Sequence, residues 1–442
     1  MNRSEFLKTS IIAAGSTLVG GTLSAAPGII TPFITRRPLA KFRTALIGTG
    51  WWGTNILRCA LQAGESTLVA LCDVDQRQLK KCSEEVTKLT SDKPKLYRDF
   101  RELLNTEKPD IVIVATPDHW HPLIAIAAMQ VGAHVYVEKP IGHTINEGKA
   151  MVATARKYDR ICQVGTHRRV SPHNVSGMEF LRSGKAGKIG MVRAFVHYGG
   201  GPGQLTPDEE IPEGLDWNMW CGPAPLRNYN RTITPRGFRN YLDYANGTLG
   251  DWGIHWMDQI LWWTEEKHPR KVFSGGGRAI RRDNTDAPDH QIATFEFESF
   301  TAVWEHRQFA GNNAEKTHPQ QAVGAYFYGT EGTFHQGWLD GWTFYPVDPK
   351  KPIIHQDAKL DKPDDQNIAL LWANFLESIK SNQKPVSDIE TGHRSTNMAL
   401  LGMLSLKLGR SIDWDGNQIP NDPEANKLLS RAYRGEWQYP TV

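Results

Sequence analysis

Two segments of the sequence contain residue types that take up protons and hold charge. Lys139 follows the apolar run 134–138, and Asp251 and His255 lie four residues apart. If a helix begins at Gly250, both side chains share one face, and a carboxylate beside an imidazole makes the imidazole more basic. Such a histidine can take a proton from a hydroxyl group near neutral pH. The alternative is a strand-end lysine, a helix-capping aspartate and a packed histidine.

A glycine-rich turn lies near the start of the chain. The apolar run 44–47 leads into Gly48-x-Gly50-x-x-Gly53, and a helical pattern follows over 54–61. Gly48 permits a tight turn, Gly50 lets a diphosphate approach the backbone, and Gly53 allows a helix to pack closely on a strand. The helix N-terminus offers unpaired N–H groups to phosphate oxygens. This segment therefore predicts a dinucleotide site.

A carboxylate follows the next apolar run, at the distance from the glycine turn that a dinucleotide-binding fold requires. The run 67–72 ends at Asp73, 20 residues after Gly53, where a dinucleotide fold places the acid that binds a ribose 2′-hydroxyl. Asp73 would repel a 2′-phosphate, so the sequence predicts NAD before NADP. Arg77 and Lys80 nearby leave NADP open, and a turn-forming aspartate is the alternative for Asp73.

The first third of the chain alternates strand and helix patterns. We expect strands at 44–47, 67–73, 110–115, 134–138 and 161–165, and helices at 54–61, 76–89, 121–131 and 145–157. Nearly continuous apolar strands indicate a parallel sheet covered on both faces, which predicts an α/β, doubly wound Rossmann domain. Ligands bind beyond the carboxyl ends of such strands, where the sequence places Thr116, Asp118, Lys139 and His167.

The hydrophobic pattern of the sequence changes after residue 171. Period-two alternation at 188–198, 291–297, 301–306 and 325–329 predicts a C-terminal α+β domain with a large, mostly antiparallel open sheet. Its apolar outer face predicts a homo-oligomer, a dimer or tetramer. We expect the insert 199–249 to form loops over the cleft, and helices at 367–379 and 391–408 to pack back on the first domain.

The N-terminus has the pattern of an export signal. Arg3 and Lys8 precede a modestly apolar run, 11–23, and small residues follow at 24–26. The run is too short and glycine-rich to span a membrane. It resembles a twin-arginine signal in which Ser4 replaces the second arginine. The prediction is an exported, periplasmic protein, and a cytoplasmic enzyme with a disordered extension is the alternative. The expected divisions are a signal peptide 1–26, a linker 27–40, an NAD-binding domain 41–165, a substrate and dimerisation domain 166–365, and C-terminal helices and tail 366–442.

The composition of the chain limits the classes of ligand and partner that it is expected to bind. The 51 basic and 48 acidic residues are spread along the chain and give a net charge of +3, which argues against nucleic acid as a partner. The five cysteines lack metal-site spacing, so we expect no metal. The 15 tryptophans fit cores, and also clefts in which rings stack on sugar faces. A small neutral or weakly charged substrate fits best.

Four motifs in order and at matching spacing carry a family resemblance. They are the glycine turn, Ala115-Thr-Pro-Asp-His-Trp-His121, Glu138-Lys139-Pro140, and Gly250-Asp251-Trp-Gly-Ile-His255-Trp-Met-Asp258. Together they resemble the Gfo/Idh/MocA family of sugar and polyol oxidoreductases, from about residue 43 to about residue 410. The segment 215–225 is similar to exported members of that family.

The resemblance implies roles for individual residues. Lys139 would bind the substrate hydroxyl and stabilise the alkoxide, His255 would act as general base, and Asp251 would orient His255 and touch the substrate. Independently of the resemblance, the position of Arg168 after the last strand of the first unit would let it hold a substrate hydroxyl or carboxylate, and a surface salt bridge is the alternative.

The resemblance also implies that Thr116, Asp118 and His121 line the cofactor crevice, and a helix cap is the alternative for Asp118. The glycine turn and the strand ends add Gly48, Gly50, Trp51, Trp52, Gly53, Asp73, Glu138, Lys139 and His167 to the predicted lining. Packing against the next domain is the alternative for Trp51 and Trp52.

Three functions follow as hypotheses. The first is an NAD(P)-dependent dehydrogenase that oxidises a secondary hydroxyl of a sugar, polyol or glycoside. The second is a glycosidase that oxidises its sugar transiently and retains NAD. A separate possibility is an enzyme that oxidises one sugar while reducing another on the same retained NAD. The third, a non-catalytic sugar-binding protein, needs only the fold and the cleft.

Overall fold

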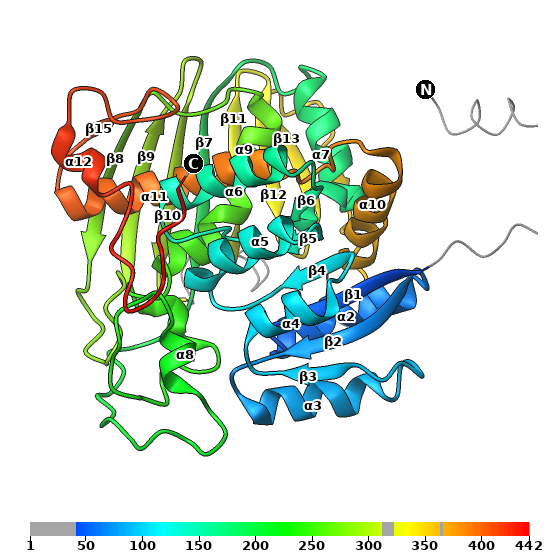
Figure 1. The fold of residues 1–442 in the computed structure, drawn as a ribbon. Coiled ribbons are helices and arrows are strands. Elements are labelled where there is room, and N and C mark those ends of the chain that lie inside the picture. The colour runs from blue at the N-terminus through cyan, green and yellow to red at the C-terminus, as the bar shows by residue number, and fades with distance from the viewer. Residues whose placement is uncertain (1–40, 312–321, 363–365, 442) are drawn as a thin grey trace, which may run out of the picture. The chain divides into compact units, whose positions relative to one another are not determined.

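The computed structural model describes residues 41–311, 322–362 and 366–441. Two sheets and their covering helices organise this part of the chain (Figure 1). The predicted signal peptide and linker, residues 1–40, lie outside the described residues. Within the described ranges, no helix is long and apolar enough to cross a membrane.

The first sheet has six parallel strands in the order β3-β2-β1-β4-β5-β6. The strands are β1 (Phe42–Ile47), β2 (Ser66–Cys72), β3 (Lys95–Tyr97), β4 (Ile111–Val114), β5 (His134–Val137) and β6 (Cys162–Val164). Every residue of β4 is buried, because helices cover both faces. The predicted Rossmann fold is confirmed. The short strand β3, which has one buried residue, and the helix α4 (Phe100–Glu107) after it were not predicted from the sequence.

Two apolar cores fill the two sides of this sheet. On one side, Leu46 and Ile113 pack with helices α2 (Trp51–Gln62), α3 (Gln76–Val86) and α10 (Ile368–Ser381). On the other side, Ile47 and Val112 pack with α4, α5 (His121–Gln130) and α6 (Ile145–Lys157). Through α10, a C-terminal helix completes the core of the N-terminal sheet.

The second sheet has nine strands in the order β14-β13-β12-β11-β7-β10-β9-β8-β15. They are β7 (Ile189–His197), β8 (Lys271–Gly277), β9 (His290–Glu296), β10 (Thr301–Arg307), β11 (Val323–Gly329), β12 (Gly332–Gly337), β13 (Trp342–Pro346), β14 (Ile354–Gln356) and β15 (Ile412–Asp413). All neighbours pair antiparallel except β7 and β10. In β10 buried and half-buried residues alternate, so one face packs against α7 (Pro172–Arg182), α9 (Ile254–Thr264) and α11 (Ile389–Leu408). The predicted mostly antiparallel sheet is confirmed.

The insert between β7 and α9 has an aromatic core of its own. Trp217 stacks on Trp220 with ring centroids 4.7 Å apart, and Tyr244 packs edge-on against Trp220 at 4.9 Å. The helix α8 (Trp217–Cys221) and the 3-10 turn η3 (Gly237–Asn240) lie in this insert, which ends in the π-helical turn η4 (Leu249–Gly253). The remaining short elements are η1 (Asp118–Trp120), η2 (His167–Val170) and α12 (Pro423–Lys427).

Candidate active site

A cavity of about 660 Å³ lies where the strands of the first sheet end. Gly48, Asp73, Thr116 and Glu138, which follow β1, β2, β4 and β5, all line it. The insert contributes 234–236, Phe238 and Arg239, and the second domain contributes Asp251, Trp252, His255 and Trp338. The cavity is therefore shared by both sheets and the insert.

The glycine turn forms the wall of the cavity next to β1. Gly48 has a φ of +93°, and a Cβ on Gly53 would lie 2.0 Å from the Gly48 carbonyl oxygen. A Cβ on Gly50 would meet no protein atom within 4 Å, so open space lies over this residue. Helix α2 begins at the next residue without a side-chain cap. Open space above uncapped N–H groups fits the diphosphate of a dinucleotide.

Asp73 is held by its own loop and by the glycine turn. The amide and hydroxyl of Thr49 donate to Asp73 Oδ2 at 2.7 and 2.9 Å, and the Asp75 amide donates to Oδ1 at 2.9 Å. Burial raises the pKa of Asp73, although these hydrogen bonds oppose the rise. Arg77 and Lys80 are the two cations that could have accommodated the 2′-phosphate of NADP. Both lie beside carboxylates, because Arg77 binds Asp75 at 2.7 Å and Lys80 lies 4.0 Å from Glu84.

Asp251 joins the two domains at the centre of the cavity. Lys139 Nζ donates to Asp251 Oδ1 at 2.8 Å and to the Asp251 carbonyl at 2.9 Å. Arg239 Nε lies 3.2 Å from the same Oδ1. Burial acts to raise the pKa of Asp251, but the charges of Lys139 and Arg239 outweigh it and lower the pKa to about 2. The carboxylate is thus ionised between two cations.

His255 lies in the same cavity but does not pair with Asp251. Its ring centroid is 5.4 Å from that of His167 and 4.9 Å from that of Trp338, and its Nδ1 has no hydrogen-bond partner among the described residues. Burial lowers the pKa of His255 well below 6.5, and Lys139 adds to this shift.

The expected Asp251–His255 pair is therefore corrected. The segment does not start as an α-helix at Gly250, because η4 winds as a π-helical turn from Leu249. The Asp251 carboxylate contacts Lys139 Nζ at 2.8 Å and Arg239 Nε at 3.2 Å instead. Asp251 is directed toward Lys139, and the imidazole of His255 is less basic than usual rather than more.

Two buried carboxyl groups line the cavity near Lys139. Burial raises the pKa of Asp118 to about 7 and that of Glu138 to about 6, while the charge of Lys139 opposes both shifts. His121 connects their loops, because its ring nitrogens lie 2.7 Å from the carbonyl oxygens of Thr116 and Pro140. The loops after β4 and β5 are thereby fixed relative to each other.

The sequence expectation for Arg168 differs from its place in the structure. His167 lines the cavity, but Arg168 is not among the described lining residues. The Arg168 guanidinium packs 3.7 Å from the ring centroid of Trp338, and Trp338 itself lines the cavity. Arg168 therefore contacts a lining ring of the cavity rather than the cavity itself. Trp51 is 55% exposed and lies under the guanidinium of Arg236 at 4.4 Å.

Arg236, Arg239 and Trp338 are among the lining residues that the sequence did not indicate. The two arginines lie in an insert without periodicity, and Trp338 follows the end of β12. The one available signal was the tryptophan content, which had suggested stacking on sugar faces without indicating which ring. Within the described ranges, no group of three or more His, Cys, Asp or Glu side chains could hold a metal ion.

Family models match nearly all of the described chain. A model of the NAD-binding Rossmann fold of an oxidoreductase family matches residues 42–166. A model of the C-terminal alpha/beta domain of that oxidoreductase family matches residues 188–439. The first match includes the glycine turn and Lys139, and the second includes Arg239, Asp251 and His255.

Curated relatives match over a shorter stretch. An alpha-N-acetylgalactosaminidase of Shewanella oneidensis is 28% identical over 210 residues, which are 43% of this chain and 44% of that protein. A glycosyl hydrolase family 109 protein of another Shewanella is 28% identical over 201 residues, or 42% of this chain and 44% of that protein. The chain thus matches less than half of the length of these relatives.

Solved structures share the fold over most of the chain. The WlbA dehydrogenase of Bordetella pertussis, in complex with NADH and UDP-GlcNAcA, has a TM-score of 0.63 at 19% identity and covers 85% of this chain and 99% of its own. Levoglucosan dehydrogenase with NADH and levoglucosan has a TM-score of 0.65 at 16% identity, covering 86% and 100%. An aldose-aldose oxidoreductase of Caulobacter crescentus with glycerol has a TM-score of 0.61 at 20% identity, covering 85% and 100%. At these identities the likeness shows the fold.

Proposed function

The chain belongs to the Gfo/Idh/MocA family of oxidoreductases, and from this membership we propose that it oxidises a secondary hydroxyl group of a sugar, polyol or glycoside. The main support is one observation. Lys139 from the first domain, and Asp251 and His255 from the second, line the same cavity as the glycine turn. A binding protein needs a cleft but not a base and a fixed ammonium group in it.

NAD is the proposed cofactor. When bound, it accepts a hydride from the carbon that bears the hydroxyl group. The space over Gly50 and the uncapped start of α2 suit its diphosphate, and Asp73 suits a ribose 2′-hydroxyl better than a 2′-phosphate. The contacts of Arg77 and Lys80 with acidic side chains further favour NAD over NADP.

The chain's own residues would handle the proton and the oxygen. Lys139 would donate a hydrogen bond to the substrate oxygen and stabilise its developing negative charge. His255, kept neutral by burial, would accept the hydroxyl proton. Asp251 would hold the amine of Lys139 in place rather than orient the histidine. The half-buried ring of Trp338 offers an apolar surface for a sugar face.

Turnover on a panel of substrates tests this function. Purified protein with NAD would be given free sugars, polyols and p-nitrophenyl glycosides, and reduced nicotinamide would be followed by absorbance. We expect reduction with at least one sugar-type substrate. Saturable sugar binding without turnover on any member of the panel would instead favour a non-catalytic sugar-binding protein.

A glycosidase that keeps NAD bound is the second candidate, and the names of the relatives support it. An alpha-N-acetylgalactosaminidase is among the proteins that this chain matches, over less than half of their length. Such an enzyme would oxidise the sugar transiently, eliminate the aglycone, add water and reduce the sugar again. Released p-nitrophenol without accumulation of reduced cofactor would support this candidate and contradict simple dehydrogenation. Native mass spectrometry would show whether a dinucleotide stays bound, as internal recycling between two sugars or within one glycoside requires.

Export and self-association are further parts of the proposal. Residues 1–26 would direct export, which fractionation of cells producing the full chain and a chain lacking 1–26 would test. The outer face of the second sheet would form a dimer or tetramer, since Phe273 and Ile292 on neighbouring strands are 50% and 54% exposed. Ile292→Asp should reduce the mass measured by light scattering to that of a monomer.

A further inference from the structure

We propose that Arg239 is a positioning residue of this site, which holds the carboxylate of Asp251 in the orientation that fixes the amine of Lys139. The part of this inference that concerns turnover by Lys139 rests on the proposed function. The contacts of Arg239 are observed in the structure and do not depend on that function. No family motif named above contains this arginine, which comes from the insert.

The contacts place Arg239 and Lys139 on one oxygen atom. Arg239 Nε lies 3.2 Å from Asp251 Oδ1, and Lys139 Nζ lies 2.8 Å from the same atom. The amine also reaches the Asp251 carbonyl at 2.9 Å. Rotation of the carboxylate would move Oδ1 away from the amine, and a second cation on that oxygen resists the rotation.

The side chain of Arg239 is itself supported. Its guanidinium lies 4.6 Å from the ring centroid of Phe238, which is buried. The side chain of Asp251 is 20% exposed and that of Lys139 is 13% exposed, so water screens these contacts only in part. A planar guanidinium directs its N–H groups more strictly than a lysine ammonium, so Arg239→Lys would restore the charge but not the direction.

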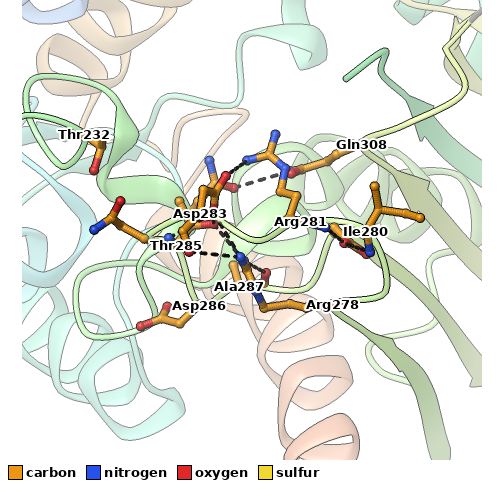
Figure 2. Close-up of polar contacts among 12 residues, drawn as sticks. Thr232, Arg278, Ile280, Arg281, Asp283, Thr285, Asp286, Ala287 and Gln308 are labelled. Atoms are coloured by element: carbon orange, nitrogen blue, oxygen red, sulfur yellow. Dashed lines mark hydrogen bonds and ion pairs between the residues drawn. The ribbon is translucent and has the colours of Figure 1, made fainter. Parts of the chain in front are cut away.

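The backbone beside Arg239 is tied to a distant loop. The carbonyl of Asn240 accepts hydrogen bonds from the amides of Asp286 and Ala287 at 3.1 and 3.0 Å. That loop is cross-linked internally, as Figure 2 shows, because Arg278 donates to the Asp283 carboxylate at 2.9 Å and to the Ala287 carbonyl at 3.1 Å. The segment that carries Arg239 therefore has a fixed anchor.

One glutamine connects this segment with the helix that carries Asp251. Gln308 Nε2 donates to Thr248 Oγ1 at 2.6 Å and lies 3.3 Å from Asn240 Oδ1. Thr248 precedes Asp251 by three residues, and Asn240 follows Arg239 directly. The two partners of the Arg239–Asp251 ion pair are thus held at a set distance through Gln308, which Figure 2 labels beside the loop.

Kinetics of three variants test the inference. Arg239→Ala should lower kcat about 10- to 100-fold on the best substrate of the panel, the loss expected for a hydrogen bond between charged groups of about 1.5–3 kcal/mol. KM and the affinity for NAD should change much less, Arg239→Lys should recover part of kcat, and millimolar guanidinium ion should partly rescue Arg239→Ala. Arg231→Ala is the matched control, because the side chain of this insert arginine is 68% exposed and forms an ion pair with Glu209 at 3.0 Å, away from Asp251.

A kcat of Arg239→Ala within twofold of the native enzyme would overturn the inference. So would a loss that guanidinium and lysine both fail to restore, since that result indicates a general structural role. Crystal structures of the native protein and of Arg239→Ala test the same inference without a substrate. In Arg239→Ala the carboxylate of Asp251 should leave Lys139 or occupy more than one orientation, whereas a single orientation with the Lys139 contact retained would overturn the inference. If the native protein turns over nothing on the panel, the proposed function fails, and the crystal structures still decide the role of Arg239.

Discussion

The glycine turn and the insert line the same cavity but are built in different ways. The turn fits by local sterics, since Gly48 has positive φ and Gly53 packs against the carbonyl of Gly48 within six residues of chain. The insert depends on contacts between distant residues, such as those of Asn240 with the loop at 286–287. The glycine-turn side of the cavity is thus specified by contiguous sequence and the insert side by tertiary contacts. Substitutions in the first should affect cofactor binding, and those in the second should affect turnover.

The largest expected effect separates turnover from cofactor binding. Lys139→Ala and His255→Ala should each lower kcat/KM by about 10²–10⁴-fold, because each removes a group that stabilises or accepts charge in the transition state. Fluorescence titration should give nearly unchanged affinity for NAD. Arg231→Ala is the control. If either variant kept the kcat/KM of the native enzyme, the group that it lacks would have no part in the reaction.

A matched pair of glycine variants tests whether the glycine turn holds the cofactor. Gly53→Ala should destabilise the fold by about 1–3 kcal/mol and weaken NAD binding, because its Cβ would lie 2.0 Å from a backbone oxygen. Gly50→Ala meets no protein atom within 4 Å, so its Tm should stay unchanged while NAD affinity falls. Thermal unfolding and NAD titration of both variants measure this. Unchanged NAD affinity in Gly50→Ala would contradict the placement of the diphosphate.

A smaller effect concerns the choice of cofactor. Asp73→Asn should reduce the preference for NAD over NADP by about tenfold or more, the effect of losing a charged hydrogen-bond acceptor worth about 1.5–3 kcal/mol. Asp73 also accepts two hydrogen bonds from Thr49, so unfolding should be measured in parallel. An unaltered ratio of the two dissociation constants would show that another group selects the cofactor.

The smallest effect is the protonation of His255. Burial, with the charge of Lys139, lowers the pKa of His255, so its imidazole should stay neutral as the pH falls through 6.5. The unfolded chain binds this proton more readily, so this group's contribution to the free energy of unfolding is present above pH 6.5 and declines below it. An NMR titration of the ring protons, assigned with His255→Asn, measures the shift. A midpoint at or above 6.5 would contradict the buried setting.

Much of the first domain could be predicted from sequence. The helix at 145–157 was placed at the bounds that α6 has, and the strand at 110–115 contains β4, because both have clear apolar patterns. The short strand β3, with one buried residue, lacks such a pattern. The glycine turn and the crevice beyond the strand ends were predictable because they depend on neighbouring residues and on topology.

The details of the second half were not predictable. The spacing of Asp251 and His255 suggested a pair, but the carboxylate contacts Lys139 and Arg239, two cations from distant parts of the chain. Arg239 reaches the site through an insert held by Gln308, and no local pattern indicates such a contact. Period-two alternation identified the sheet, yet it could not indicate that Trp338, at the end of one strand, turns into the cavity.

The central claim is that Lys139 and His255, from different domains, act on the same substrate oxygen. A double-mutant cycle of Lys139→Ala and His255→Ala, measured as kcat/KM on one substrate, tests it most directly. If the two groups serve one proton transfer, the double variant should lose little more activity than the more damaged single variant. Losses that multiply fully would show that the two groups act independently and would contradict the account.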